Sequence, residues 1–255
     1  ALEAMIKKYE NEGGVAAFIM EAVGQDSGAV PTTKEYHKAA RELCDKYGML
    51  LIYDEVVTGF RLGMGGAQSI FGTSPDLTVF GKIIGGGYAG SGGIGGRKEI
   101  MSMLTAGVDA SDNIKVKVGG TMTANPLTSL AGITVIKELE RLNVHDALDK
   151  ASDYFMRGIA DLSEKYDVPA IIYHHSILHI DVSGVQHVPY CIDSKDPQFQ
   201  SQLEDAYMNY IEFSMALAAE GLIIANGGKT YLPYGSIDIL DDALAVYERV
   251  FSQYE

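Results

Sequence analysis

Two charged side chains stand directly after short apolar runs of this sequence. Asp54 follows residues 49–53 (MLLIY), an uninterrupted apolar run of strand length. Open α/β sheets bind ligands at the carboxyl ends of their strands, so this position favours a binding role. A carboxylate there needs a cationic partner, and the protonated ring nitrogen of a cofactor is one. The alternative, a helix N-cap after a strand, is the more common use of a lone Asp.

Lys82 occupies a similar position after the apolar run 77–80 (LTVF), with glycine at position 81 and again at 85–87. We expect a lysine at that position to be poorly solvated, which favours the neutral amine that attacks aldehydes. The glycines allow a backbone and a cofactor to approach each other closely. A lysine whose side chain reaches from a strand end into solvent is the alternative.

Four segments taken together are more specific than either residue alone. They are 54–61 (DEVVTGFR), 75–78 (PDLT), 81–87 (GKIIGGG) and 120–127 (GTMTANPL). In this combination the sequence resembles the class III aminotransferase family, and within it the glutamate-1-semialdehyde 2,1-aminomutase branch. The resemblance is strong over residues 1–140 and weaker over the rest.

The resemblance implies an α/β fold of the type I class of pyridoxal 5'-phosphate (PLP) enzymes. That fold has a mostly parallel sheet with helices on both faces and a smaller C-terminal α+β domain. The residue patterns agree, since strand, helix and strand patterns at 15–23, 31–47 and 49–53 make one βαβ unit. We therefore assign residues 1–140 to the large cofactor-binding domain and 141–255 to the small domain.

The same resemblance implies a role for individual residues. Lys82 would hold PLP as a Schiff base and move the proton between the substrate carbon and the cofactor. Asp54 would pair with the pyridinium nitrogen, and Val56 would pack on the ring. Thr121 would bind the phosphate of the neighbouring subunit's cofactor, which implies a homodimer with shared active sites. Asp26 falls where related sequences place a residue near the cofactor's phenolic oxygen or facing substrate, so it is a further candidate for cofactor binding.

The implied reaction is the transfer of an amino group between small amino and keto compounds, or its migration within one molecule. A racemase or epimerase is an alternative, because Lys82 could return the proton to the α-carbon. The family's N-terminal half, with its phosphate-binding loop, is missing from this sequence. A second alternative is therefore a catalytically incomplete fragment of such an enzyme. A third alternative is a nucleotide-binding module built on residues 90–95 (GSGGIG), which match G-x-G-x-x-G without a clear preceding strand. We interpret those glycines as turns around the lysine segment.

Composition narrows the classes of partner. The 255 residues carry a net charge of −14, which disfavours nucleic acid as a partner. Cys44 and Cys191 are the only cysteines, too few for a disulfide framework, and no apolar run approaches the length of a membrane span. We therefore expect a cytoplasmic protein that does not bind membranes. The first residue is not Met and the first twelve have a helical pattern, so we expect the sequence to begin inside a larger protein.

No metal site is expected. His174, His175 and His179 lie close together in the sequence, but in a strand only the last two share a face, and no third ligand is evident. We interpret them as ordinary strand histidines.

Overall fold

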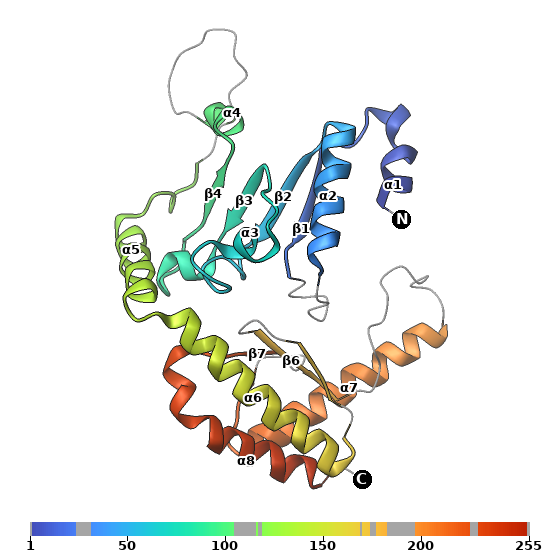
Figure 1. Cartoon of the computed structure of the whole chain (residues 1–255), viewed down its shortest axis with the longest axis vertical. Coiled ribbons are helices and arrows are strands. Elements are labelled where there is room, and N and C mark those ends of the chain that lie inside the picture. The colour runs from blue at the N-terminus through green and yellow to red at the C-terminus, as the bar shows by residue number, and fades with distance from the viewer. Residues whose placement is uncertain are drawn as a thin grey trace. The chain divides into compact units, whose positions relative to one another are not determined.

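The computed structural model describes residues 2–23, 32–104, 116, 119–168, 170–173, 177–182, 197–224 and 229–253. These fall into two compact units, one that ends at Leu142 and one that begins at Asn143. Each unit is described by itself below, and both can be followed in Figure 1.

The first unit is built on a four-stranded sheet in the order β1-β2-β3-β4 (Figure 1). Its strands are β1 (Ala17–Glu21), β2 (Leu50–Glu55), β3 (Leu77–Phe80) and β4 (Gly93–Gly96). The first three are parallel and β4 is antiparallel to β3. The parallel register places the carboxyl ends of β1, β2 and β3 at one edge of the sheet, as the βαβ pattern predicts.

Three helices of the first unit contribute to one buried cluster. They are α1 (Leu2–Lys8), α2 (Lys34–Tyr47) and α3 (Gly66–Phe71). Helix α2 begins after Thr33, whose side chain accepts a hydrogen bond from the Tyr36 amide, and ends at Gly48, which has a φ of 66°. The cluster joins Cys44 of α2 and Phe71 of α3 to Leu51 on β2. These contacts cover the face of β2 that carries its fully buried side chains.

Asp76 ties the amino ends of β2 and β3 together. Its buried carboxylate accepts hydrogen bonds from the Leu51 amide at 2.8 Å, from Arg41 at 2.7 Å and from Arg97 at 2.9 Å. Burial alone would raise the pKa of Asp76, but the amide and the two guanidinium groups outweigh it and lower the pKa. This ion-paired cluster lies at the end of the strands opposite to Asp54.

The first unit ends with α5 (Pro126–Arg141), a long helix that packs on the turn containing Lys82. That turn is a short 3₁₀ helix, η2 (Lys82–Gly85). The remaining short helices of this unit are η1 (Glu10–Glu12), α4 (Lys98–Met101) and η3 (Ser102–Leu104).

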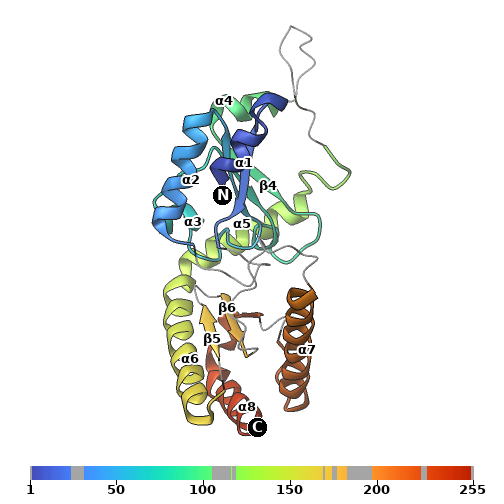
Figure 2. The ribbon, with the colours of Figure 1, turned by 90° about the vertical axis from the view of Figure 1, so that its right-hand side faces the viewer.

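The second unit combines an antiparallel sheet with three helices. The sheet has the order β5-β6-β7, from β5 (Ile171–Tyr173), β6 (Ile177–Asp181) and β7 (Lys229–Tyr231). The helices are α6 (Val144–Tyr166), α7 (Pro197–Ala219) and α8 (Leu240–Phe251), the last preceded by η4 (Tyr234–Ile239). The two longest, α6 and α7, can be followed in Figure 2. A buried ring cluster joins all three helices: Phe155, Phe213, Tyr247 and Phe251.

Two local predictions are wrong. The apolar residues 222–224 (LII) have the pattern of a strand, but they form none, because Gly221 at φ +93° ends α7 and the Leu222 amide bonds back to the Leu217 carbonyl at 2.9 Å. This bond, together with Gly221 to Ala218, is the Schellman arrangement that closes many helices. In addition, the glycines at 90–95 do not all lie in turns, because Gly93–Gly96 form β4. No helix opens within this run, as a dinucleotide fingerprint would require.

None of the described helices is both long and apolar enough to cross a membrane.

Candidate active site

Asp54 and Lys82 lie at the same edge of the sheet, on neighbouring strands. Asp54 is the second-last residue of β2 and pairs in register with Val79 of β3. Strand β3 ends at Phe80, and Lys82 follows after Gly81. The parallel pairing of β2 and β3 therefore brings the carboxylate and the amine, 28 residues apart in sequence, to one edge.

Asp54 lies on the partly exposed face of β2. Burial alternates along the strand, so Leu51, Tyr53 and Glu55 are buried while Asp54 is half-buried on the other face. One carboxylate oxygen accepts a hydrogen bond from the Val56 amide at 3.1 Å. The next helix, α3, has Gly65 at its N-cap, so Asp54 caps no helix and that interpretation is wrong. The half-exposed carboxylate remains available to a cationic group.

Lys82 has an uncommon backbone conformation and an exposed side chain. Its φ of 46° lies in the left-handed region, which residues other than glycine adopt seldom. The side chain is exposed, so the expected poor solvation is wrong for this chain. The strand end thus presents the amine to the outside of the unit rather than burying it.

Helix α5 holds the Lys82 turn in place through two glycines. A Cβ on Gly132 would overlap the carbonyl oxygen of Ile84, and a Cβ on Gly86 would lie 2.6 Å from the carbonyl carbon of Ala131. The backbones of the helix and the turn are therefore in direct contact. Thr128 adds a hydrogen bond from its hydroxyl to the Ala89 carbonyl at 3.3 Å. This close packing maintains the left-handed conformation of the lysine.

Val56 lies against the same turn. A Cβ on Gly81 would come within 2.9 Å of Val56 Cγ1, so the two residues are in direct contact. Val56 is half-buried and follows Asp54 by two residues. The apolar side chain therefore lies against the residue that directly precedes Lys82.

Thr121 lies in an exposed turn that precedes α5. The Thr123 amide bonds to the Gly120 carbonyl at 3.0 Å, and the neighbouring Met122 packs on Gly90. The N-cap of α5 is Asn125, whose side chain accepts hydrogen bonds from the amides of residues 127 and 128. Thr121 therefore does not cap its own helix. The amides of residues 127 and 128 already donate to Asn125, so they are not free to bind an anion.

The remaining residues that the sequence drew attention to are Asp26, a cofactor-binding candidate, and three histidines for which no site is expected. Asp26, His174 and His175 lie outside the described residues. His179 is a buried residue of β6. Among the described residues, no group of three or more His, Cys, Asp or Glu side chains could hold a metal ion.

The sequence analysis overlooked a buried histidine beside the site. His37 of α2 contacts the Tyr53 hydroxyl through Nδ1 at 2.6 Å and the Thr32 hydroxyl through Nε2 at 2.8 Å. Thr32 donates its own proton to the Ala22 carbonyl, so it accepts from Nε2, and Nδ1 accepts from Tyr53. This assigns a neutral imidazole, in keeping with burial, which lowers the pKa of His37.

Its partner Tyr53 directly precedes Asp54. Burial raises the pKa of Tyr53 to about 12, so the phenol stays protonated and can donate. The His37 and Tyr53 pair therefore fixes the strand residue next to Asp54.

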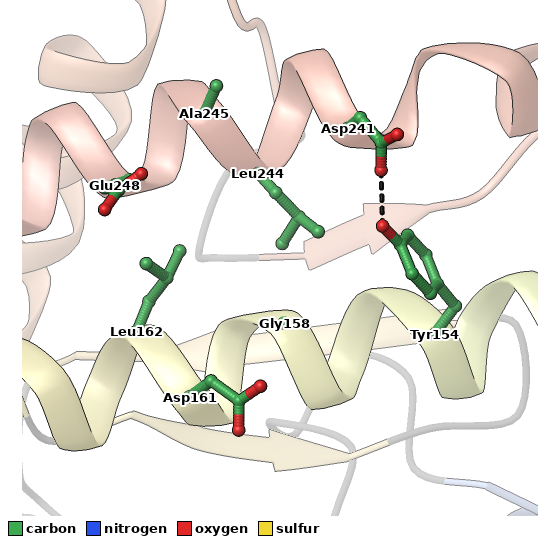
Figure 3. A pocket seen from close by; sticks show the side chains of 8 residues that line it. All are labelled: Tyr154, Gly158, Asp161, Leu162, Asp241, Leu244, Ala245 and Glu248. Carbon is green, nitrogen blue, oxygen red and sulfur yellow. Dashed lines mark hydrogen bonds between the residues drawn. The ribbon is translucent and has the colours of Figure 1, made fainter.

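A separate groove of about 310 Å³ lies in the second unit, between α6 and α8 (Figure 3). Tyr154 donates a hydrogen bond to Asp241 across it, and Glu248 pairs with Lys165 at 2.6 Å. Two of its three carboxylates are thus already engaged, and no predicted site residue lines it. The groove is a junction between two helices rather than an assembled reaction site.

The sequence of this chain is similar to a family of known proteins and to individual members of it. The model of the family "Aminotransferase class-III" matches residues 1–232. A glutamate-1-semialdehyde 2,1-aminomutase of Chloroherpeton thalassium is 47% identical over 155 residues, which are 61% of this chain and 34% of that protein. The enzyme of the same name from Legionella pneumophila (strain Corby) is 41% identical over 165 residues, 65% of this chain and 36% of that protein.

The fold is also that of known enzymes. The crystal structure of an omega-transaminase from Sphaerobacter thermophilus superposes with a TM-score of 0.79 at 26% identity, over 98% of this chain and 55% of that one. The matched region thus spans about a third of the curated relatives' length, and about half of the solved structure's. These matches confirm the predicted fold class. Because the family model covers most of its length, the chain belongs to the class III aminotransferase family.

Proposed function

We propose that this chain carries the part of a PLP site that contains the Schiff-base lysine, in an enzyme that transfers amino groups or moves them within a molecule. The observation behind this proposal is the presence of the Asp54 carboxylate and the Lys82 amine at one sheet edge on adjacent parallel strands. The reaction is amino transfer between a small amino compound and a keto compound, or migration of an amino group within one molecule. The aminomutase relatives support migration, and the omega-transaminase supports transfer.

The residues present fit the ring of PLP. Asp54 offers a half-exposed carboxylate to a protonated ring nitrogen, and Val56 offers an apolar surface beside it. Lys82 offers an exposed primary amine to an aldehyde. When bound, PLP supplies an electron sink that stabilises negative charge on the substrate carbon.

The chain's own residues then have separate tasks. With PLP bound, the Asp54 carboxylate would keep the proton on the ring nitrogen, and Val56 would limit how the ring can tilt. Nζ of Lys82 would accept the proton from the substrate carbon and return it. The contact of α5 with the lysine turn keeps Nζ at one place during these steps.

We further propose a homodimer in which Thr121 of one subunit serves the site of the other. Its support is the exposed turn at 120–124, which places the Thr121 hydroxyl on the outside of its own unit. A threonine hydroxyl is a suitable donor to a phosphate oxygen.

Cys44, a free buried thiol, supports a reducing, cytoplasmic setting.

The decisive experiment locates the cofactor. The protein, expressed as its gene encodes it, is loaded with PLP, reduced with borohydride, digested and mapped by mass spectrometry. We expect the covalent adduct on Lys82, and we expect Lys82→Ala to lose the visible absorbance band of the bound cofactor.

Lys98→Ala is the matched control, because Lys98 is an exposed lysine of the same unit at the start of α4. This variant should keep the band. An adduct on Lys98, or an unchanged band in Lys82→Ala, would refute the assignment.

A further inference from the structure

Glu55 is a buried carboxyl group that the proposed reaction does not use. It is the last residue of β2, and 1% of its surface is exposed. It stands between Asp54 and Val56, the two residues assigned to the cofactor ring. Burial raises the pKa of Glu55 above its ordinary value, against the effect of the Ala67 amide and the Thr58 hydroxyl. Such a group is costly to keep and calls for an explanation.

The Glu55 side chain connects the end of β2 to the start of α3. Its Oε2 accepts a hydrogen bond from the Ala67 amide at 2.8 Å and from the Thr58 hydroxyl at 3.2 Å. A Cβ on Gly66, which has a φ of +57°, would lie 2.5 Å from the same oxygen. Only glycine at position 66 lets the helix come this close, so the segment is built around the carboxyl group.

The backbone of Glu55 connects the same segment to β3 and the lysine turn. The Gly59 amide donates to the Glu55 carbonyl at 2.9 Å, and Glu55 pairs in register with Phe80. A Cβ on Gly59 would lie 2.8 Å from the Phe80 ring, so the 55–59 bend rests on the residue two before Lys82. Through its side chain and its backbone, Glu55 thus contacts the start of α3, the 55–59 bend and the end of β3.

We propose that Glu55 is a positioning residue, which fixes Asp54 and Val56 relative to the Lys82 turn by holding the β2 end to α3. The inference rests on the proposed function. Its physical basis is that this side chain joins the end of β2 to α3, while the 55–59 bend joins it to Phe80. Loss of the hydrogen bonds from Thr58 and Ala67 to Glu55 would let Asp54 and Val56 shift relative to the cofactor ring. A misplacement of about 1 Å is enough to lower turnover about 100-fold.

The test compares two substitutions of Glu55 in the PLP-loaded protein. Glu55→Gln keeps an oxygen at the same reach, so we expect near-normal turnover and a normal circular dichroism band of the bound cofactor. Glu55→Asp withdraws the oxygen by one methylene, so we expect kcat to fall about 100-fold with little change in KM. The same variant should shift or weaken the dichroism band, which reports how the ring is held.

Asp76→Asn is the matched control, because Asp76 is a buried carboxylate at the opposite end of the same two strands. It should lower the melting temperature without altering the dichroism band or the kcat of the folded protein. If Glu55→Asp behaves like this control, Glu55 is merely structural and the proposal is wrong. A Glu55→Gln variant as impaired as Glu55→Asp would also overturn it.

Thr58→Val covers the case in which Glu55→Asp does not fold. It removes one of the two hydrogen bonds to Oε2, so it should change the dichroism band in the same direction but by less. An unchanged band in Thr58→Val would then count against the proposal. Failure of the proposed function looks different, because the unsubstituted protein would then show no cofactor band on Lys82, and both proposals would fall.

Discussion

At the scale of single residues, accessible charged side chains stand next to buried side chains that anchor the strand. In the proposed site the charged residues Asp54 and Lys82 are half-buried and exposed, whereas Tyr53 and Glu55, the neighbours of Asp54, are buried and hydrogen-bonded. In a strand, successive side chains point to opposite faces, so a reactive residue always has anchoring neighbours. Asp54 and Glu55 are adjacent acids, but the pleat of β2 points their side chains to opposite faces. Asp54 is therefore half-buried and Glu55 is buried.

Asp54→Asn tests the charge of the acid. The amide keeps the shape and can still accept the hydrogen bond from the Val56 amide, but it cannot hold a proton on the ring nitrogen. We expect kcat to fall by a much larger factor than the affinity for PLP, because Lys82 still holds the cofactor. Steady-state kinetics and equilibrium dialysis of PLP measure the two quantities. Near-normal turnover in Asp54→Asn would show that the carboxylate plays no part in the chemistry.

The sequence identified candidate residues but not their surroundings. The resemblance indicated Asp54, Val56 and Lys82, and the structure brings them to one edge. The exposure of Lys82 was not predictable, because it depends on what packs around the strand end. On α2 the predicted apolar face included Tyr36, which is 46% exposed, while His37 is buried. Hydrophobicity patterns cannot find a helix histidine whose burial is stabilised by the hydroxyl of Tyr53 on a neighbouring strand.

At the scale of elements, the lysine turn depends on its contact with α5. This contact requires the absence of side-chain atoms at both Gly132 and Gly86, which the sequence shows only as two glycines far apart. A helix and a turn whose backbones touch have little freedom to slide. The position of Lys82 is thus set by an element that begins 44 residues later in the chain.

Gly132→Ala tests this contact. The new methyl group would overlap the Ile84 carbonyl oxygen, so the helix or the turn must move. We expect overpacking to reduce the free energy of unfolding by about 1–3 kcal/mol, as measured in urea, and to weaken the visible band of the bound cofactor. Gly119→Ala is the control, since nothing lies within 4 Å of a Cβ at that position. Equal effects from the two substitutions would show that the contact is unimportant.

Element prediction succeeded where one period dominates and failed next to glycines, where a glycine-rich segment forms a strand and an apolar segment does not. The helix pattern 144–166 coincides with α6, and the strand pattern 77–80 coincides with β3. Strand β4 has the sequence GIGG, which no propensity favours, and it forms because β3 offers an edge. The apolar residues 222–224 resemble a strand but follow a Schellman closure of α7. In both cases a neighbouring element decided the outcome.

At the scale of the whole molecule, the shared-site hypothesis makes a prediction about mixed subunits. Subunits carrying Lys82→Ala are mixed with subunits carrying Thr121→Ala, in the protein as its gene encodes it. If Thr121 serves the partner's site, each mixed dimer has one wholly defective site and one intact site, so activity should rise well above that of either parent. Activity after subunit exchange is the measurement. Mixed dimers with no more activity than the parents would contradict sharing.

The sheet of the first unit has a further consequence for behaviour in solution. Within the described residues β1 and β4 are its outer strands, and each pairs on one side only. The outer strand β1 has the sequence AFIME, with Ile19 58% exposed, and it carries neither proline nor lysine to discourage another strand from joining it. The outward backbone groups of residues 17–20 pair with no other strand among the described residues, so they can pair with a strand of another chain. Expressed by itself, this polypeptide should associate edge to edge as its concentration rises, so its solubility depends on what pairs with β1.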